Sequence, residues 1–313
     1  MDSTFVTFEG LGFSLPIDPV AFSVGGFEVK WYGVIIAFGF TLAVLFGGRI
    51  AYTWKMNLDV MIDVLIYGTI AAILGARIYY VLPLWSEYKG NLLEIFNIRA
   101  GGLGVFGGLA AGLVAGTLVA KKKGLNWLNL YDCAGMSFLI GQGIGRWGNF
   151  MNQESFGSNT ATALFRMWSP QIAARIAASQ AGLAAQGFQV DPELPVHPIF
   201  LYESLWCLTG FVILYIACRK FRKFSGQIFG MYGIWYGTGR FMVECFKTDS
   251  NYIGATGLSG SQGVAILLFG ISLVLLIVGF HRAKQRALRG EPPTCAIPET
   301  IQPPPAVKKS KAK

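Results

Sequence analysis

The chain has 313 residues, of which 53% are hydrophobic and only 14% are charged, and its mean hydropathy is +0.49. Because soluble globular proteins carry about 25% charged residues, this composition indicates an integral membrane protein and excludes an ordinary soluble domain. The formal net charge of +9 does not indicate a nucleic-acid partner, because the basic residues gather in short connectors between apolar segments.

Seven apolar segments are long enough to cross a bilayer, which takes roughly 20 residues of helix. The predicted helices cover residues 31–53, 60–82, 102–120, 129–147, 199–218, 227–245 and 261–280. Two of them are interrupted by a charge, the second by Arg77 and the fourth by Arg146. We therefore predict an all-α polytopic integral membrane protein with seven transmembrane helices.

Basic residues occur in every second connector. The basic set comprises Arg49 and Lys55; Lys121, Lys122 and Lys123; Arg219, Lys220, Arg222 and Lys223; and Arg282, Lys284, Arg286 and Arg289. Connectors rich in Lys and Arg stay in the cytoplasm, so the N-terminus is predicted to lie outside and the C-terminus inside. The same charges favour contact with anionic membrane lipid.

The connectors also suggest how the chain is divided. The expected parts are an extracytoplasmic segment (1–30), helices 1–4 (31–148), an extracytoplasmic subdomain between helices 4 and 5 (149–198), helices 5–7 (199–281) and a disordered basic cytoplasmic tail (282–313). Residues 170–187 are typical of a surface helix within the subdomain. The five cysteines form no CxxC pair and have no metal-ligand spacing with the two histidines, so neither a metal nor a cofactor is expected.

Polar residues follow the fourth apolar segment in the run GRWGNFMNQESFG, residues 145–157. Arg146, Asn149, Asn152 and Glu154 lie there, and Gly157 ends the run. A guanidinium group binds phosphate through paired hydrogen bonds, and amides bind hydroxyl groups. The run therefore predicts a site for an anionic lipid headgroup. The alternative is a lone arginine whose aliphatic stem lets it reach the membrane boundary.

The sixth segment carries a second charged group in YGTGRFMVE, residues 236–244. Tyr236, Arg240 and Glu244 are four residues apart and therefore share one face of a helix. The alternative is a structural ion pair that lowers the cost of inserting the helix. Two arginines near one outer interface favour an anionic ligand, whereas Arg77 in the second segment fits a ligand contact and a structural contact equally well.

Three further features are weaker. His197 precedes the proline that opens the fifth segment, and it is either a substrate contact or an interfacial hydrogen-bonding residue. Tyr32 belongs by default to an aromatic belt at the membrane interface. The run GGLGVFGGLAAG, residues 101–112, indicates close helix packing through small residues.

Together these motifs resemble the prolipoprotein diacylglyceryl transferase family of bacterial membrane enzymes. The most specific is Arg-x-Gly-Asn-Phe-x-Asn-x-Glu-x-x-Gly, and KWYG, GARIYYVL, GGLGVFGGL, HPIFLYE and YGTGRFMVE accompany it in the family's order. The resemblance covers about residues 25–280. It implies a multi-pass enzyme of the bacterial plasma (inner) membrane with seven spans and an external N-terminus.

The resemblance also implies a reaction. The family transfers the diacylglyceryl group of phosphatidylglycerol to the lipobox cysteine thiol of a preprolipoprotein signal peptide, which forms a thioether and releases glycerol 1-phosphate. By motif match the family's essential positions are Tyr32, Arg146, Asn149, Glu154, Gly157, Tyr236, Arg240 and Glu244. We expect Arg146, Arg240, Glu154 and Tyr236 to be catalytic. Substrate binding is expected from Asn149, Gly157, Tyr32, Asn152, Glu244, Arg77 and His197.

One departure from the family affects the mechanism. Many members carry His before Gly-Gly at the start of the third span, and this chain has Phe106. The base that takes the thiol proton must then be Glu154, Glu244 or water, with His197 a remote candidate. Gln153 replaces a glycine common in the family, and Ser158 stands where a basic residue is frequent.

Two other classes fit the residues less well. An anion or lipid transporter or channel would use the intramembrane arginines along a path through the membrane. The chain has no apparent internal repeat, and its polar cluster lies at one interface of the membrane. Both observations count against a transporter. A structural membrane scaffold would predict that Arg146→Ala harms stability but no specific reaction.

Overall fold

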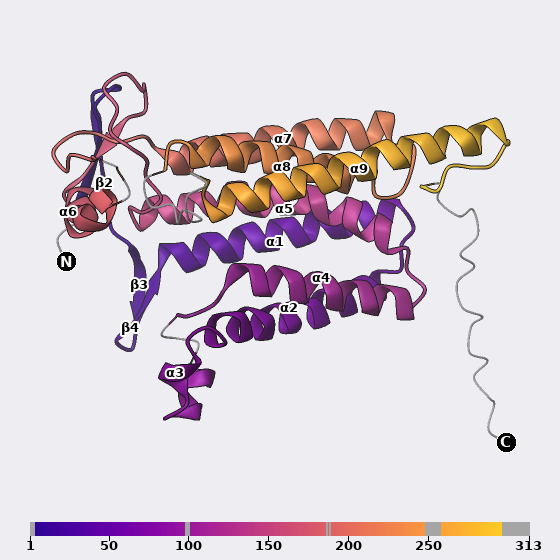
Figure 1. Cartoon of the computed structure of the whole chain (residues 1–313), viewed down its shortest axis with the longest axis horizontal. Helices are drawn as coiled ribbons and strands as arrows, with labels where there is room; N and C mark the ends of the chain where they lie inside the picture. The colour runs from indigo at the N-terminus through magenta and orange to yellow at the C-terminus, as the bar shows by residue number, and fades with distance from the viewer. Residues whose placement is uncertain (1–3, 98–100, 186, 188, 248–257, 296–313) are drawn as a thin grey trace. The chain divides into compact units, whose positions relative to one another are not determined.

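The computed structural model describes residues 4–97, 101–185, 187, 189–247 and 258–295. The chain is mostly helical (Figure 1). It divides into two compact units, Met1–Gly47 with Asp132–Thr294, and Gly48–Tyr131 with Cys295–Lys313. The first unit carries all of the described strands and most of the predicted site residues.

Seven long helices occur where the apolar segments predict them. They are α1 (Trp31–Thr53), α2 (Leu58–Val81), α4 (Val105–Lys122), α5 (Trp127–Met151), α7 (Ile199–Phe221), α8 (Gln227–Glu244) and α9 (Gly260–Leu288). Within the described residues, α1, α2, α4, α7 and α9 are long and apolar enough to cross a membrane. The chain is therefore a multi-pass membrane protein, and the count of seven spans remains a prediction. The two other long helices, α5 and α8, carry Arg146 and Arg240.

Strands were not anticipated, and they change the predicted division of the chain. β1 (Thr4–Phe8) pairs antiparallel with β2 (Phe13–Ile17) and with β5 (Met167–Trp168). A separate hairpin joins β3 (Val20–Val24) to β4 (Phe27–Lys30) through two glycines with positive φ, the conformation that a tight hairpin turn needs. Residues 1–30 and 149–198, expected to be separate parts, therefore share a sheet.

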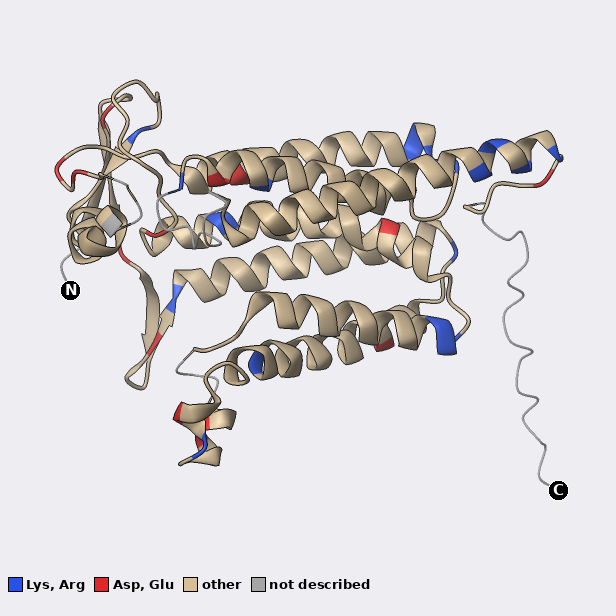
Figure 2. Ribbon diagram, viewed as in Figure 1, with Lys and Arg blue, Asp and Glu red and all other residues tan. Residues whose placement is uncertain are grey.

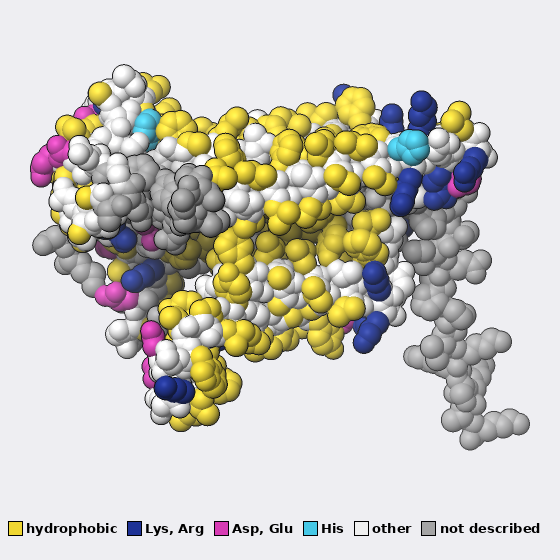
Figure 3. All heavy atoms as spheres, viewed as in Figure 1, with side chains coloured by type: hydrophobic (Ala, Val, Ile, Leu, Met, Phe, Trp, Pro, Cys, Tyr) yellow, Lys and Arg dark blue, Asp and Glu magenta, His cyan; other side chains and the backbone are white. Residues whose placement is uncertain are grey.

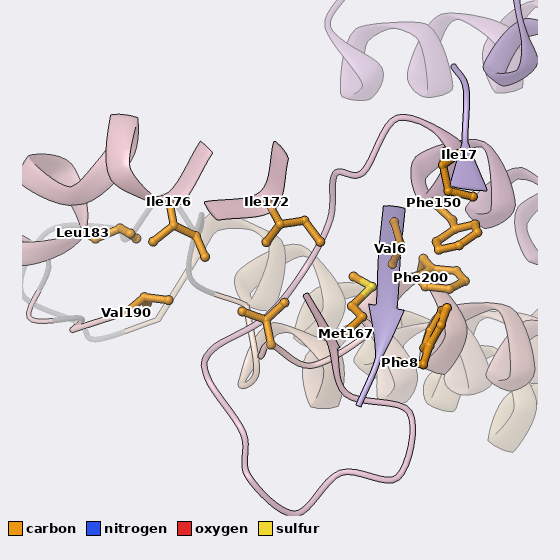
Figure 4. Packing of buried hydrophobic residues seen from close by; sticks show 11 residues of the cluster. Val6, Phe8, Ile17, Phe150, Met167, Ile172, Ile176, Leu183, Val190 and Phe200 are labelled. Carbon is orange, nitrogen blue, oxygen red and sulfur yellow. The ribbon is translucent and has the colours of Figure 1, made fainter. Parts of the chain in front are cut away.

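The shared sheet lies on a hydrophobic core that also receives the predicted surface helix, α6 (Pro170–Ala185). Figure 4 shows this cluster, in which Ile172 and Ile176 come from α6 and Val6 comes from β1. Phe150 and Phe200 stack within it, with ring centroids 4.6 Å apart. Because Phe150 lies in the last turn of α5 and Phe200 in the first turn of α7, the core fixes the ends of two long helices.

In the same unit, α8 packs between α7 and α9 through glycines. A Cβ at Gly233 would lie 1.9 Å from Oγ of Ser272 on α9, and one at Gly237 would lie 2.9 Å from the carbonyl oxygen of Ala265. Outward faces are apolar (Figure 3). Lys and Arg gather at the ends of α7 and α9 far from the strands (Figure 2).

The second unit is built on the pair α2 and α4, with α3 (Trp85–Tyr88) and the short 3₁₀ helix η1 (Leu92–Phe96) between them in the chain. A Cβ at Gly107 would lie 2.2 Å from Cβ of Tyr79, and one at Gly75 would lie 2.3 Å from Cβ of Ala111. The glycine-dense start of the third span therefore packs closely against α2, as the small residues indicate.

The C-terminal region differs from the expected disordered tail. α9 continues to Leu288, so the first seven residues of the segment 282–313 are helical. The rest of the tail is described only as far as Cys295, and residues 296–313 lie outside the described residues.

Candidate functional site

Four charged side chains from three helices form one ion-pair network. Glu203 on α7 is ion-paired with both arginines, with Oε2 3.1 Å from Nη1 of Arg146 and Oε1 2.9 Å from Nη1 of Arg240. The second Arg240 nitrogen lies 3.1 Å from Oε2 of Glu244 and 3.2 Å from Oγ of Ser261. Arg146 and Glu203 lie near the helix ends that adjoin the folded segment 149–198, whereas Arg240 and Glu244 lie in the last turns of α8.

The network is largely withdrawn from the surface, and its charges balance. The side chains of Glu203 and Glu244 are 7% and 4% exposed, whereas those of Arg146 and Arg240 are 25% and 19% exposed. Buried charges are tolerated when they are paired in this way. The ion pair between Arg240 and Glu244, which was the alternative interpretation of their spacing, is present, and one carboxylate brings the two predicted arginines together.

Arg146 is the arginine of this network with donors to spare. In the part of the chain that the structure describes, its guanidinium has one charged partner, Glu203. Arg240 contacts two carboxylates and a hydroxyl. A guanidinium has five N–H donors, so Arg146 retains several that an anionic ligand can occupy.

The amides of the GRWGNFMNQESFG run converge on Glu154. Oε1 of Glu154 accepts from Nδ2 of Asn149 at 2.8 Å and from Nδ2 of Asn152 at 3.5 Å. The residues on either side, Gln153 and Ser155, have φ of 50° and 59°, a left-handed backbone that is costly for side chains other than glycine. The turn therefore directs Glu154 back toward the end of α5.

Gly157 is required by a close backbone contact. A Cβ there would lie 2.6 Å from the carbonyl oxygen of Phe246, and the Gly157 N–H donates to the carbonyl of His197 at 3.0 Å. Nδ1 of His197 lies 3.1 Å from Oη of Tyr202, and burial lowers the pKa of His197 below its ordinary value. Gly157 and His197 are therefore held together at the connection that leads into α7, and their predicted role in substrate binding remains a prediction.

The predicted tyrosines lie beside the same helices. Tyr32 at the start of α1 packs against Gly148, where a Cβ would be 3.0 Å from its ring. Tyr236 lies one turn before Arg240 on α8 and stacks on Tyr232, with centroids 5.7 Å apart. Both therefore stand next to residues that carry the polar cluster.

The contacts of Arg77 favour the structural alternative over its predicted role in substrate binding, which remains a prediction. Arg77 lies in the second unit, where Nε and Nη2 donate to the carbonyls of Ile95 and Glu94, and Nη1 donates to those of Gly101 and Gly102. Its guanidinium also lies over the rings of Tyr80 and Tyr88. Four carbonyl acceptors leave little room for a ligand, so Arg77 holds the loop after η1.

The sequence did not identify Glu203 as the centre of the network. It appeared within HPIFLYE as one of two polar residues a turn into the fifth segment, with no assigned partner. The available signal was charge: a carboxylate one turn inside an apolar helix needs a cation nearby. Phe106, the departure from the family pattern, lies half-exposed on α4 in the second unit.

Apolar helices that carry a paired arginine–carboxylate network near their ends, joined to a small folded segment, define a multi-pass membrane protein with a largely buried polar site. Comparison with known proteins identifies the group. A family model described as prolipoprotein diacylglyceryl transferase matches residues 19–278. The chain belongs to this family.

Individual relatives agree over most of their length. A phosphatidylglycerol–prolipoprotein diacylglyceryl transferase of Bacillus mycoides is 38% identical over 282 residues, which cover 89% of this chain and 98% of the relative. The protein of that name from Finegoldia magna is 37% identical, covering 82% of this chain and 94% of its own. That from Staphylococcus aureus is 37% identical, covering 83% and 88%.

Proposed function

We propose that the protein transfers the diacylglyceryl group of phosphatidylglycerol to the lipobox cysteine of preprolipoproteins. The names of relatives that match nearly their full length support this activity. The observation in the molecule that carries it is the Arg146–Glu203–Arg240 network, in which one guanidinium retains donors for an anionic headgroup. The corresponding location is the bacterial plasma membrane, with the N-terminus and the strands outside.

The reaction needs stabilisation of a leaving phosphate. The thiolate sulfur attacks the glyceryl carbon, the S–C bond forms, and the C–O bond to phosphate breaks with its electron pair passing to the phosphate oxygen. Donors aimed at this developing charge stabilise the transition state more than the ground state. Arg146 supplies those donors directly, and Arg240 holds the shared carboxylate of Glu203 in place and supplies further positive charge. Asn149, Asn152 and Tyr236 orient the oxygens of the headgroup.

The thiol proton requires a base, and Glu154 fits best. Glu244 is 4% exposed and already ion-paired with Arg240, whereas Glu154 is half-buried and held by amides alone. Proton transfer to Glu154 therefore breaks no ion pair that the described residues show. Phe106 has no titratable group, so it cannot accept the proton.

The test is transfer from phosphatidylglycerol to a lipobox peptide by the purified protein in lipid nanodiscs. We expect thioether-linked peptide and glycerol 1-phosphate from the parent protein. Arg146→Ala should lower kcat by about 100-fold or more, in the range seen when one transition-state donor is removed. The matched control is Arg289→Ala, because the Arg289 side chain is 72% exposed. Unchanged turnover in Arg146→Ala, or no transfer by well-folded parent protein, would contradict the proposal.

The role of Glu154 as the base can be tested separately, through the pH dependence of the transfer rate. Glu154→Gln should lower transfer at pH 7 and recover toward the parent rate as the pH rises to about 8.5, the ordinary pKa of a thiol. Above that pH the peptide thiol ionises without help. Equal pH profiles for Glu154→Gln and the parent would show that Glu154 is not the base. An anion or lipid transporter would instead move phosphatidylglycerol between leaflets without consuming the peptide thiol.

A further inference from the structure

Trp206 on α7 and Trp235 on α8 are each hydrogen-bonded to the other's helix. The indole N–H of Trp206 donates to the carbonyl oxygen of Trp235 at 3.0 Å, and the indole N–H of Trp235 donates to the carbonyl oxygen of Trp206 at 3.0 Å. Their rings stack, with centroids 4.4 Å apart and planes at 21°. We call this pair the tryptophan clasp, and it joins the neighbouring helices α7 and α8, which run side by side in Figure 1.

Each indole occupies the space above a glycine of the opposite helix. A Cβ at Gly239 would lie 2.1 Å from Nε1 of Trp206, and a Cβ at Gly210 would lie 2.1 Å from Nε1 of Trp235. Both helices therefore carry the same pattern, Trp-x-x-x-Gly, at residues 206–210 and 235–239. Each helix supplies one indole ring and one glycine over which the opposite indole packs. Neither helix can therefore slide or rotate against the other without breaking both hydrogen bonds.

The clasp adjoins the ion pair of the candidate site. Arg240 directly follows Gly239, and Glu203 lies three residues, or nearly one helical turn, before Trp206. The 2.9 Å contact between Nη1 of Arg240 and Oε1 of Glu203 therefore crosses the same two helices close to the clasp.

A related bond flanks the other ion pair. Nε1 of Trp147 donates to Oγ of Ser204 at 3.1 Å, and that hydroxyl donates to the carbonyl of Gly143 at 2.8 Å. Trp147 follows Arg146, and Ser204 follows Glu203. Each arginine contact of Glu203 thus has an indole hydrogen bond across the same pair of helices.

We propose that Trp206 and Trp235 are positioning residues for the transfer reaction, acting through the Arg240–Glu203 contact. The inference rests on the proposed function. Charge stabilisation depends on donors that are fixed before the reaction, and misplacement by about 1 Å can cost about 100-fold in rate. The clasp sets the register of α7 and α8, so it fixes Arg240 relative to Glu203, the carboxylate that also contacts Arg146.

The variants Trp206→Phe and Trp235→Phe test this, because phenylalanine keeps an aromatic ring but has no N–H. A matched control is Trp168→Phe, which removes an indole–carbonyl hydrogen bond of 2.9 Å to Pro192 outside α7 and α8. Trp206→Phe and Trp235→Phe should each lower kcat by about fivefold to tenfold, because each loses one hydrogen bond of the clasp, and KM for phosphatidylglycerol should stay within about twofold of the parent value. The double variant should be little slower than either single one, because the pair acts as a unit.

Hydrogen exchange provides a measurement that does not depend on activity. In nanodiscs, backbone amides of residues 236–244 should exchange faster in Trp206→Phe and Trp235→Phe, and at the parent rate in Trp168→Phe. Unchanged kcat in an active protein, equal losses of kcat in the control, or unchanged exchange in α8 would overturn the inference. Absence of transfer by the parent would overturn the proposed function instead. The exchange rates would then still test whether the clasp holds α8 in place.

Discussion

At the scale of single residues, the partners of an arginine decide what it does. Arg77 donates to four backbone carbonyls. Arg222 makes contacts of 3.0 and 2.8 Å with fully buried Asp132. Arg240 contacts three side chains and Arg146 only one charged group within the described residues. Only the last arrangement leaves a guanidinium open to a ligand.

Replacing Arg77 with methionine should therefore affect stability. Methionine fills a similar space but takes the donors away from four partly exposed carbonyls, and the free energy of unfolding should fall by roughly 1–3 kcal/mol. Thermal unfolding in detergent measures the change, and exposed Arg289→Met should stay within about 0.5 kcal/mol of the parent. Normal stability with weakened phosphatidylglycerol binding would restore the ligand role for Arg77.

His197 gives the protein a pH dependence of known sign. Burial lowers its pKa in the folded state, so the unfolded chain binds the proton more readily. Its effect on stability is absent above the unfolded pKa of about 6.5, and the folded protein loses stability as the pH falls below that value. The melting-temperature difference between the parent and His197→Gln should therefore shrink from pH 8 to pH 5. A constant difference would show that the folded pKa is not lowered.

The sequence could identify the polar residues of the site but not how they pair. Arg146 and Arg240 stood out because charges in apolar helices are costly, and the spacing of Arg240 and Glu244 predicted their contact. The link between the two arginines runs through Glu203, which lies 57 residues after Arg146 and 37 before Arg240. No helical periodicity connects positions on three different helices, so that link required the structure.

At the scale of elements, the turn after α5 combines strain with function. Ser155 has φ of 59°, and its buried Oγ has no hydrogen-bond partner among the described residues. Ser155→Gly removes both the backbone strain and the unpartnered hydroxyl, but glycine also makes the unfolded chain more flexible. The net effect should be a gain of about 1 kcal/mol in the free energy of unfolding.

Ser158→Gly in the same segment provides the comparison for that prediction. Ser158 has no positive φ, so glycine there should cost up to about 1 kcal/mol. Denaturation of the two variants and the parent measures both effects. Destabilisation by Ser155→Gly as large as that by Ser158→Gly would show that the backbone of Ser155 is not strained.

Helices were predictable from the sequence and strands were not, for a physical reason. A span of about 20 apolar residues suffices to identify a membrane helix, since its hydrogen bonds are internal. The strand β1 is stabilised by β5, and Phe8 pairs with Met167. A local pattern cannot reveal a partner 159 residues away, so the sheet and the merging of residues 1–30 with 149–198 emerged only from the structure.

At the scale of the whole molecule, the native cysteines provide a test of the predicted orientation. Cys245 is exposed at the end of α8 near the candidate site, and Cys295 is half-buried after α9. The three others are buried. A membrane-impermeant maleimide should label Cys245 in spheroplasts and Cys295 in inverted vesicles, as read by mass spectrometry. Labelling of Cys295 from outside would reverse the orientation.

The pairing of β1 with β5 has a consequence for the order of events during synthesis. At roughly 5–20 residues per second, the ribosome makes β5 about 10–30 seconds after β1. During that interval α1, α2, α4 and α5 are completed. β1 can pair with β2 at once, but its other edge has no partner strand until β5 is made. A chaperone that shields exposed strand edges would find its substrate in this interval, and completion of the sheet would end it.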